Sequence, residues 1–108
     1  MKMGSVPALA FAAAILICLP ALADSGDARS SSDAKSTAGR ELFLRNCAHC
    51  HGADGHGDEG PDLHKLEESD AWIANRIRRG KAGEMTAFAG KLQPVEIDLL
   101  VEYLRTLK

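Results

Sequence analysis

The pattern of apolar and polar positions divides the chain into three parts. Residues 6–23 are almost wholly apolar, residues 24–38 contain no large apolar side chain, and residues 39–108 alternate between apolar and charged groups. A segment without large apolar side chains cannot bury enough surface to offset its ordering entropy. The pattern therefore predicts a disordered polar tail or linker over residues 24–38 and one folded domain over residues 39–108.

Helical periodicity recurs three times in the third part. The predicted helices cover residues 38–47, 69–79 and 94–107. Ser36 or Thr37 is the expected N-cap of the first helix, and Ser69 begins the second, which should end at Gly80. Pro94 suits the first turn of the third helix, whose apolar residues recur at intervals of three and four. Because no segment shows sustained period-two alternation, we expect an all-α fold of three to four helices.

The N-terminal segment has the order of a secretory signal peptide. A short start with one positive charge precedes the apolar stretch, and Ala21-Leu22-Ala23 fits the small-x-small pattern of a cleavage site. We predict that residues 1–23 are a signal peptide and that the mature protein lies in the periplasm. An uncleaved membrane anchor is the alternative, since a span needs roughly 17–25 apolar residues. We expect the protein to be attached to a membrane only if this segment is not cleaved.

Charge and cysteine content narrow the class of protein. The formal net charge is −2, and loss of residues 1–23 with Lys2 makes it −3, unlike a nucleic-acid-binding protein with its basic face. Cys18 lies in the signal segment, so the mature chain keeps Cys47 and Cys50. A disulfide across so short a loop contributes little, whereas small exported domains commonly need a stabilising group. The composition therefore indicates a large buried cofactor.

The strongest chemical signal is Cys47-Ala48-His49-Cys50-His51. CxxCH is the attachment motif of haem c. Two thiols one helical turn apart can each add across a haem vinyl group, and the following histidine then supplies the proximal nitrogen to the iron. A structural disulfide, a thioredoxin-like redox pair and a zinc site are the alternatives, but the redox pair requires a βαβ setting that the pattern lacks. We predict one covalently bound haem c.

Met85 is the candidate for the sixth iron ligand. It is the only methionine outside the signal segment and lies 34 positions after His51, within a Gly-rich stretch that can wrap to the opposite haem face. A thioether ligand raises the reduction potential, and a filled sixth site leaves no room for O₂ or peroxide. Core filling is the alternative role for this methionine. The other candidate ligands are His56, His64, Lys81 and Lys91.

With these motifs in order, residues from about Gly39 to Leu107 resemble the class I cytochromes c, particularly the small bacterial ones. The resemblance implies a small cytochrome c fold wrapped around one covalently attached haem. It also implies that Gly39 and Phe43 face Tyr103 where the first and last helices cross. The resemblance rests on the following residues and motifs: Gly39 and Phe43, CxxCH, Gly60-Pro61-Asp62-Leu63, Trp72, the Gly80–Met85 segment, and Tyr103-Leu104.

Two positions that can be compared with the family lie next to the candidate iron ligands. In the family, the carbonyl of the proline after the short loop accepts a hydrogen bond from the proximal histidine, which implies a contact between Pro61 and His51. Such a bond fixes the orientation and basicity of the ligand. The family often has proline directly after the axial methionine, whereas Thr86 stands there in this chain.

These signals together indicate an electron carrier and not an enzyme, since no nucleophile–base pair accompanies the motif. We expect a monomer that meets a redox donor and a redox acceptor transiently, as weak redox encounters do. Two other functions stay open. One is a membrane-tethered cytochrome subunit of a respiratory complex, and the other is a haem-based ligand sensor or peroxidase with a labile sixth site.

Overall fold

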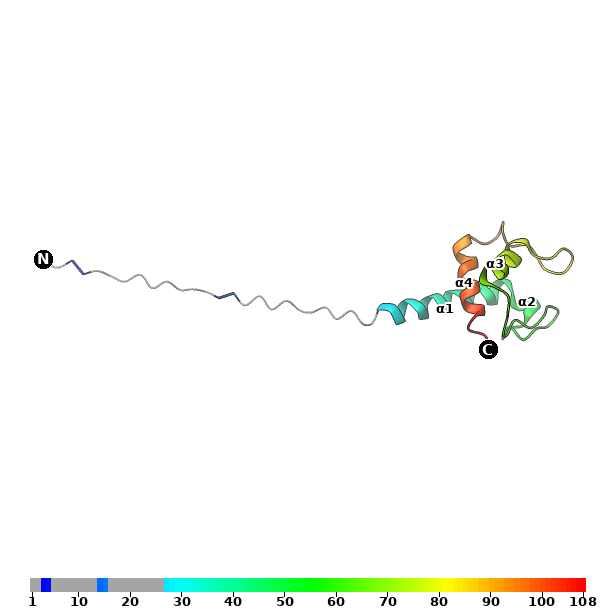
Figure 1. The fold of residues 1–108 in the computed structure, drawn as a ribbon, viewed down its shortest axis with the longest axis horizontal. Coiled ribbons are helices and arrows are strands. Elements are labelled where there is room, and N and C mark those ends of the chain that lie inside the picture. Colours follow the sequence, from blue (N-terminus) through cyan, green and yellow to red (C-terminus); the bar gives the residue numbers. More distant parts are fainter. Residues whose placement is uncertain (1–2, 5–13, 16–26) are drawn as a thin grey trace.

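A computed structural model describes residues 3–4, 14–15 and 27–108 (Figure 1). The expected signal peptide, residues 1–23, lies outside these ranges apart from four residues. Within them the chain forms four helices, α1 (Asp27–Asn46), α2 (Ala48–His51), α3 (Asp70–Arg79) and α4 (Pro94–Leu104). The described part contains no strand and a single isolated β-bridge. The all-α class expected from the sequence is confirmed.

Helix α1 begins earlier than the sequence predicts. It starts at Asp27, so the predicted disordered tail is wrong for residues 27–38, and neither Ser36 nor Thr37 is an N-cap. The first part of α1 projects from the domain (Figure 1) and is exposed almost throughout. A helix already held by packing at one end extends at about one hydrogen bond per added residue without a new nucleation step. A prediction based on apolar content alone therefore misses this N-terminal extension of α1.

Helices α1 and α4 cross in close contact at Gly39. A Cβ atom at this position would lie 2.8 Å from the Cβ of Tyr103 and closer still to the carbonyl oxygen of Leu99. Beside the crossing, the rings of Phe43 and Tyr103 lie 5.4 Å apart between centroids and are tilted by 48°. The arrangement implied by the family resemblance is confirmed, and only glycine allows this approach of the two backbones.

The boundaries of α3 follow the expected capping signals. The side chain of Ser69 accepts a hydrogen bond from the backbone N–H of Trp72 at 3.2 Å. At the other end Gly80 has a φ of 63°, a value that glycine adopts without strain. Its N–H donates to the carbonyl of Arg76 at 2.7 Å. The predicted helix over residues 69–79 is confirmed to within one residue.

Helix α4 begins as predicted and ends three residues early. Gln93 and Glu96 form a reciprocal capping box, and Pro94 occupies the first turn. The predicted end at residue 107 is wrong, because the chain tightens after Leu104. The N–H of Thr106 and its hydroxyl both bond to the carbonyl of Tyr103, at 2.9 and 2.6 Å. A side chain that competes for a terminal carbonyl favours a turn over another helical turn.

The hydrophobic core joins α1, α3 and α4 with the segment between α3 and α4. Phe43, Ile97 and Leu100 are its largest fully buried side chains. The end of α4 is also tied to the start of α3, since Arg105 donates to the Asp70 carboxylate at 2.7 Å and to the Leu66 carbonyl at 2.7 Å. Among the described residues, no helix is both long and apolar enough to cross a membrane.

Candidate cofactor site

The CxxCH motif lies on one short helix that continues directly from α1. The N–H of Cys47 donates to the carbonyl of Phe43 at 2.8 Å, and the N–H of His51 donates to the carbonyl of Cys47 at 3.0 Å. Cys47 and Cys50 are thus held one helical turn apart. Both are free thiols of intermediate exposure, so no disulfide joins them. The alternative of a structural disulfide finds no support in this geometry.

The Cys47 thiol is protonated at neutral pH. Burial raises its pKa to about 11, and the nearby Cys50 contributes in the same direction. The thiolate is the nucleophilic form of cysteine in thiol–disulfide exchange, so a raised pKa makes the side chain a poor redox nucleophile. This environment argues against a thioredoxin-like pair.

His51 is buried and fixed by two neighbours. Its side chain is the one buried polar group of the described residues, with the residue 8% exposed. The Nδ1 atom lies 2.8 Å from the carbonyl oxygen of Pro61, so the Nδ1–H tautomer donates to Pro61 and leaves Nε2 as the nitrogen able to ligate. A Cβ at Gly60 would lie 2.9 Å from His51 Cε1. The backbone of Gly60 therefore confines the His51 ring on its Cε1 side.

Met85 lies in a closed turn after α3. The N–H of Lys81 donates to the Met85 carbonyl, and the Met85 N–H donates to the Lys81 carbonyl, both at 2.8 Å. Gly80 makes this turn possible, because a Cβ there would strike the backbone of residues 85–87. The Met85 side chain is half-buried against the core. The two hydrogen bonds constrain the turn even though Thr86 follows in place of proline.

Taken together, these residues fit a covalently bound haem. Two unpaired thiols stand one turn apart, and an imidazole with one nitrogen engaged by a carbonyl follows them directly. Bound haem supplies a one-electron iron couple. The chain contributes the thioether attachment, the orientation of the imidazole and a fixed turn that carries a thioether sulfur.

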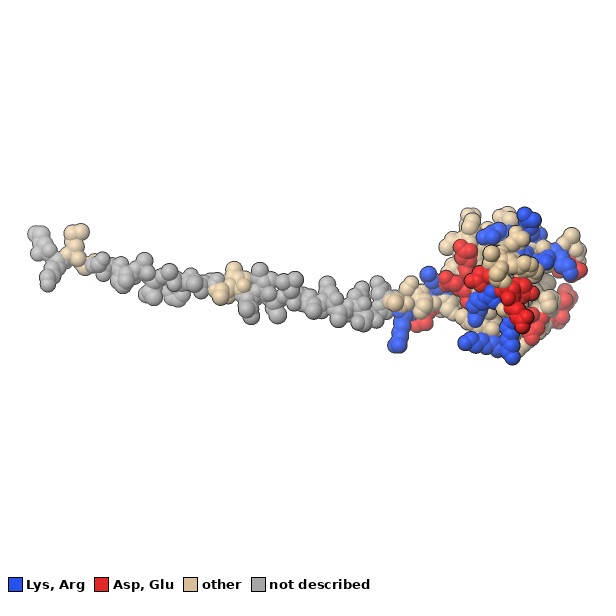
Figure 2. All heavy atoms as spheres, in the orientation of Figure 1, with Lys and Arg blue, Asp and Glu red and all other residues tan. Residues whose placement is uncertain are grey.

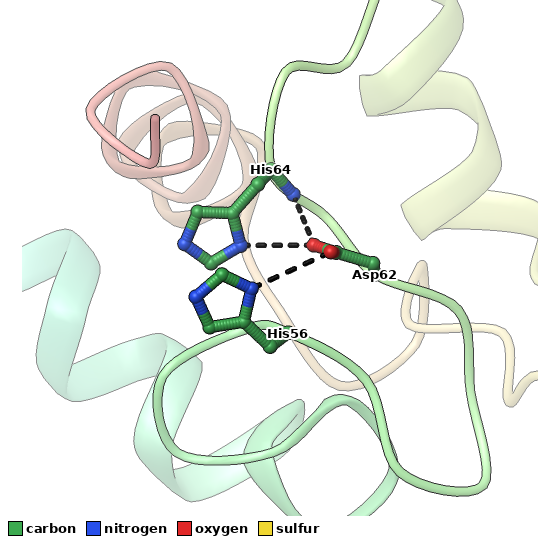
Figure 3. A group of neighbouring side chains, drawn as sticks. All are labelled: His56, Asp62 and His64. Atoms are coloured by element: carbon green, nitrogen blue, oxygen red, sulfur yellow. Dashed lines mark hydrogen bonds and ion pairs between the residues drawn. The ribbon is translucent and has the colours of Figure 1, made fainter.

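Two of the other candidate iron ligands, His56 and His64, contact a carboxylate in the structure. His56 Nδ1 and His64 Nδ1 lie 3.4 and 2.9 Å from the oxygens of Asp62, and the two rings stack at 3.7 Å with a 6° interplanar angle (Figure 3). Sequence reasoning did not bring these three residues together. Their only signal is the closeness of two histidines and an aspartate in one loop, which gives no information on side-chain direction.

The helical domain carries both signs of charge on one face of its surface. On the face shown in Figure 2, Lys and Arg side chains lie beside Asp and Glu side chains over the helical domain. Trp72 is 46% exposed and lies under the guanidinium of Arg76, 4.9 Å from the ring centroid.

Fold and site define a c-type cytochrome, an electron carrier whose cofactor is covalently bound haem c. Residues 34–104 match the family described as cytochrome c oxidase, cbb3-type, subunit III. The chain belongs to this family.

Similar proteins and structures agree with this class. The cbb3-type cytochrome c oxidase subunit FixP of Azorhizobium caulinodans is 34% identical over 64% of this chain and 26% of its own length. A cytochrome c-553-like protein of Synechocystis is 35% identical over 64% of this chain and 66% of its own length. The chain spans about a quarter of the FixP proteins that it matches.

Two solved structures share the fold. The KustC0563 c-type cytochrome superposes with a TM-score of 0.61 at 31% identity, over 65% of this chain and 96% of that one. Cytochrome cL from Hyphomicrobium denitrificans gives a TM-score of 0.64 at 25% identity, over 68% of this chain and 48% of that one.

Proposed function

We propose that this chain is exported and that its domain shuttles single electrons in the periplasm between a donor and an acceptor protein. The iron of its haem cycles between Fe(II) and Fe(III) with His51 and Met85 as axial ligands. The observation that carries the proposal is the confined imidazole of His51, held by the Pro61 carbonyl directly after two free thiols. That arrangement orients a proximal ligand and has no other evident use.

Met85 is proposed as the second ligand because its backbone is held by hydrogen bonds, while its side chain forms no hydrogen bond among the described residues. The paired hydrogen bonds with Lys81 hold the turn, and a preformed turn loses little entropy when its side chain ligates. A neutral thioether favours Fe(II) and raises the potential. The closed sixth position then restricts the haem to electron transfer.

Replacement of the sulfur tests the ligand set. Met85→Ala should lower the midpoint potential and allow rapid carbon monoxide binding to the reduced protein, while the haem stays attached. The matched control is Thr86→Ala, at the exposed residue directly after the turn, which should change neither property. An unchanged potential in Met85→Ala would assign the ligand elsewhere.

Carbon monoxide also separates the carrier from a ligand sensor or peroxidase. Reduced wild-type protein at neutral pH should bind carbon monoxide slowly and incompletely, because a ligand already occupies the sixth site. Rapid and complete binding by the wild type would instead favour the sensor or peroxidase and overturn the shuttle.

A second candidate function rests on the relatives. The matched family and the FixP proteins are described as subunits of cbb3-type cytochrome c oxidase, so the domain is alternatively a tethered electron-transfer module of such a complex. Mass spectrometry of the protein purified from its host distinguishes the two. A mass lacking residues 1–23 and including one haem supports the free carrier, whereas a retained segment and copurifying oxidase subunits support the tethered module.

A further inference from the structure

The loop between α2 and α3 carries a cluster of ligating side chains that electron transfer does not use. Among residues 3–4, 14–15 and 27–108, His56, Asp62 and His64 are the one group of at least three candidate metal ligands whose donor atoms lie within 4.8 Å of one another. Both Nδ1 atoms face the oxygens of the Asp62 carboxylate (Figure 3). The cluster therefore offers two imidazole nitrogens and one carboxylate.

The backbone that carries these side chains is held in place. The N–H of Leu63 donates to the carbonyl of Gly55 at 2.8 Å, which joins the part of the loop next to His56 to the part next to His64. The N–H of His64 donates to Asp62 Oδ1 at 2.8 Å, and the N–H of His56 donates to Asp54 at 3.1 Å. The ligands thus start from fixed positions, and little backbone ordering is required on binding.

The spacing of the donor atoms suits a small divalent cation. Two bonds of about 2.0–2.2 Å at a tetrahedral angle place their donor atoms about 3.3–3.6 Å apart. His56 Nδ1 and Asp62 Oδ2 already lie 3.4 Å apart, and His64 Nδ1 and Asp62 Oδ1 lie 2.9 Å apart. The second pair has to open by a few tenths of an ångström. The stacked ring of His56 also has to turn toward the cation, which its 59% exposed side chain allows.

The electrostatics of the loop favour a cation as well. Hydrogen bonds from His64 and His56 lower the pKa of Asp62 to about 2, so its carboxylate is charged at neutral pH. Asp54, Asp58 and Glu59 lie in the same loop, and their charges raise the local concentration of cations. A neutral imidazole is the ligating form of histidine.

We propose that His56, Asp62 and His64 form a surface site for one divalent transition-metal cation of the zinc type, with water completing the coordination. Two imidazoles and one carboxylate are a donor set that zinc accepts. The site uses none of the residues proposed to hold the haem iron, His51 and Met85. It connects two parts of the loop on either side of Pro61, whose carbonyl holds His51, so a bound cation would fasten that loop.

Zinc itself is the probe. The haem-loaded protein, purified without a polyhistidine tag, is titrated with Zn²⁺ by calorimetry at pH 7.5 in a buffer that does not coordinate metals. We expect saturable binding of one equivalent. Asp62→Asn and the double variant His56→Gln/His64→Gln should each weaken this binding at least tenfold, and X-ray absorption at the zinc edge should show nitrogen and oxygen neighbours without sulfur.

Asp58→Asn is the matched control, because Asp58 is an exposed carboxylate of the same loop outside the cluster and the substitution changes the charge equally. It should leave the affinity within about twofold of the wild type. The proposal is overturned if no saturable one-equivalent binding occurs, if Asp58→Asn weakens binding as much as Asp62→Asn, or if the double histidine variant binds as tightly as the wild type. An unchanged visible spectrum in every variant excludes loss of the haem fold as the cause.

Discussion

Gly39→Ala tests whether the crossing of α1 and α4 depends on a missing side chain. The added methyl group would lie 2.8 Å from Tyr103 Cβ, where ordinary van der Waals contact begins at 3.4 Å, and closer still to the Leu99 carbonyl oxygen. Neither neighbour can rotate away, because one is backbone and the other is the first atom of a side chain. The two helices must therefore separate.

The magnitude follows from two opposing contributions. Alanine in place of glycine stabilises a helix by about 0.5–1 kcal/mol, while overpacking of a close-packed contact costs typically about 1–3 kcal/mol. The clash with rigid neighbours places the cost in the upper part of that range. We expect a net loss of about 1–2 kcal/mol in the free energy of unfolding, which for a domain of 60–100 residues corresponds to a Tm lower by roughly 4–16 °C.

The assay is urea unfolding of the oxidised holoprotein, followed by circular dichroism at 222 nm and by haem absorbance. Gly90→Ala is the matched control, because a Cβ at Gly90 meets no atom within 4 Å and its φ lies outside the left-handed region. It should change the stability by no more than about 0.5 kcal/mol. A Gly39→Ala variant as stable as the wild type, or more stable, would refute the close-crossing argument.

Three further predictions concern the site and its loop. Cys50→Ala should impair haem attachment and folding together, because the haem serves as part of the core of so small a domain; a well-folded variant free of haem, by circular dichroism and pyridine haemochrome assay, would contradict this. Gly60→Ala should lower the free energy of unfolding by about 1–3 kcal/mol and shift the midpoint potential of the haem. The reason is that the added Cβ would lie 2.9 Å from His51 Cε1 and 3.0 Å from His51 Nδ1. If urea unfolding and potentiometry both matched the wild type, Gly60 would not confine the His51 ring. Asp62 has a folded-state pKa of about 2 against an ordinary 3.8, so its contribution to stability is present above about pH 4 and is lost as the pH falls toward 2. The stability difference between wild type and Asp62→Asn, measured by urea unfolding, should therefore shrink between pH 5 and pH 3, and a difference that grew on acidification would reverse the sign of this reasoning.

Local signals in the sequence determined most of the fold and the cofactor. The CxxCH motif indicates haem c without any tertiary information, because its chemistry requires only two thiols and an imidazole within one helical turn. Ser69 and Gly80 mark helix ends through hydrogen bonds to neighbours within four residues, and Pro94 marks a helix start through its fixed φ. Interactions so local are specified by spacing alone.

Only the tertiary structure decided features that depend on distant contacts. The extension of α1 back to Asp27 follows from a helix anchored by packing further along the chain, which the polar composition of residues 27–38 does not reveal. The convergence of His56, Asp62 and His64 depends on the hydrogen bond that draws Leu63 to Gly55. Spacing along a loop fixes which residues are available, but the direction of each side chain is set by how the loop closes.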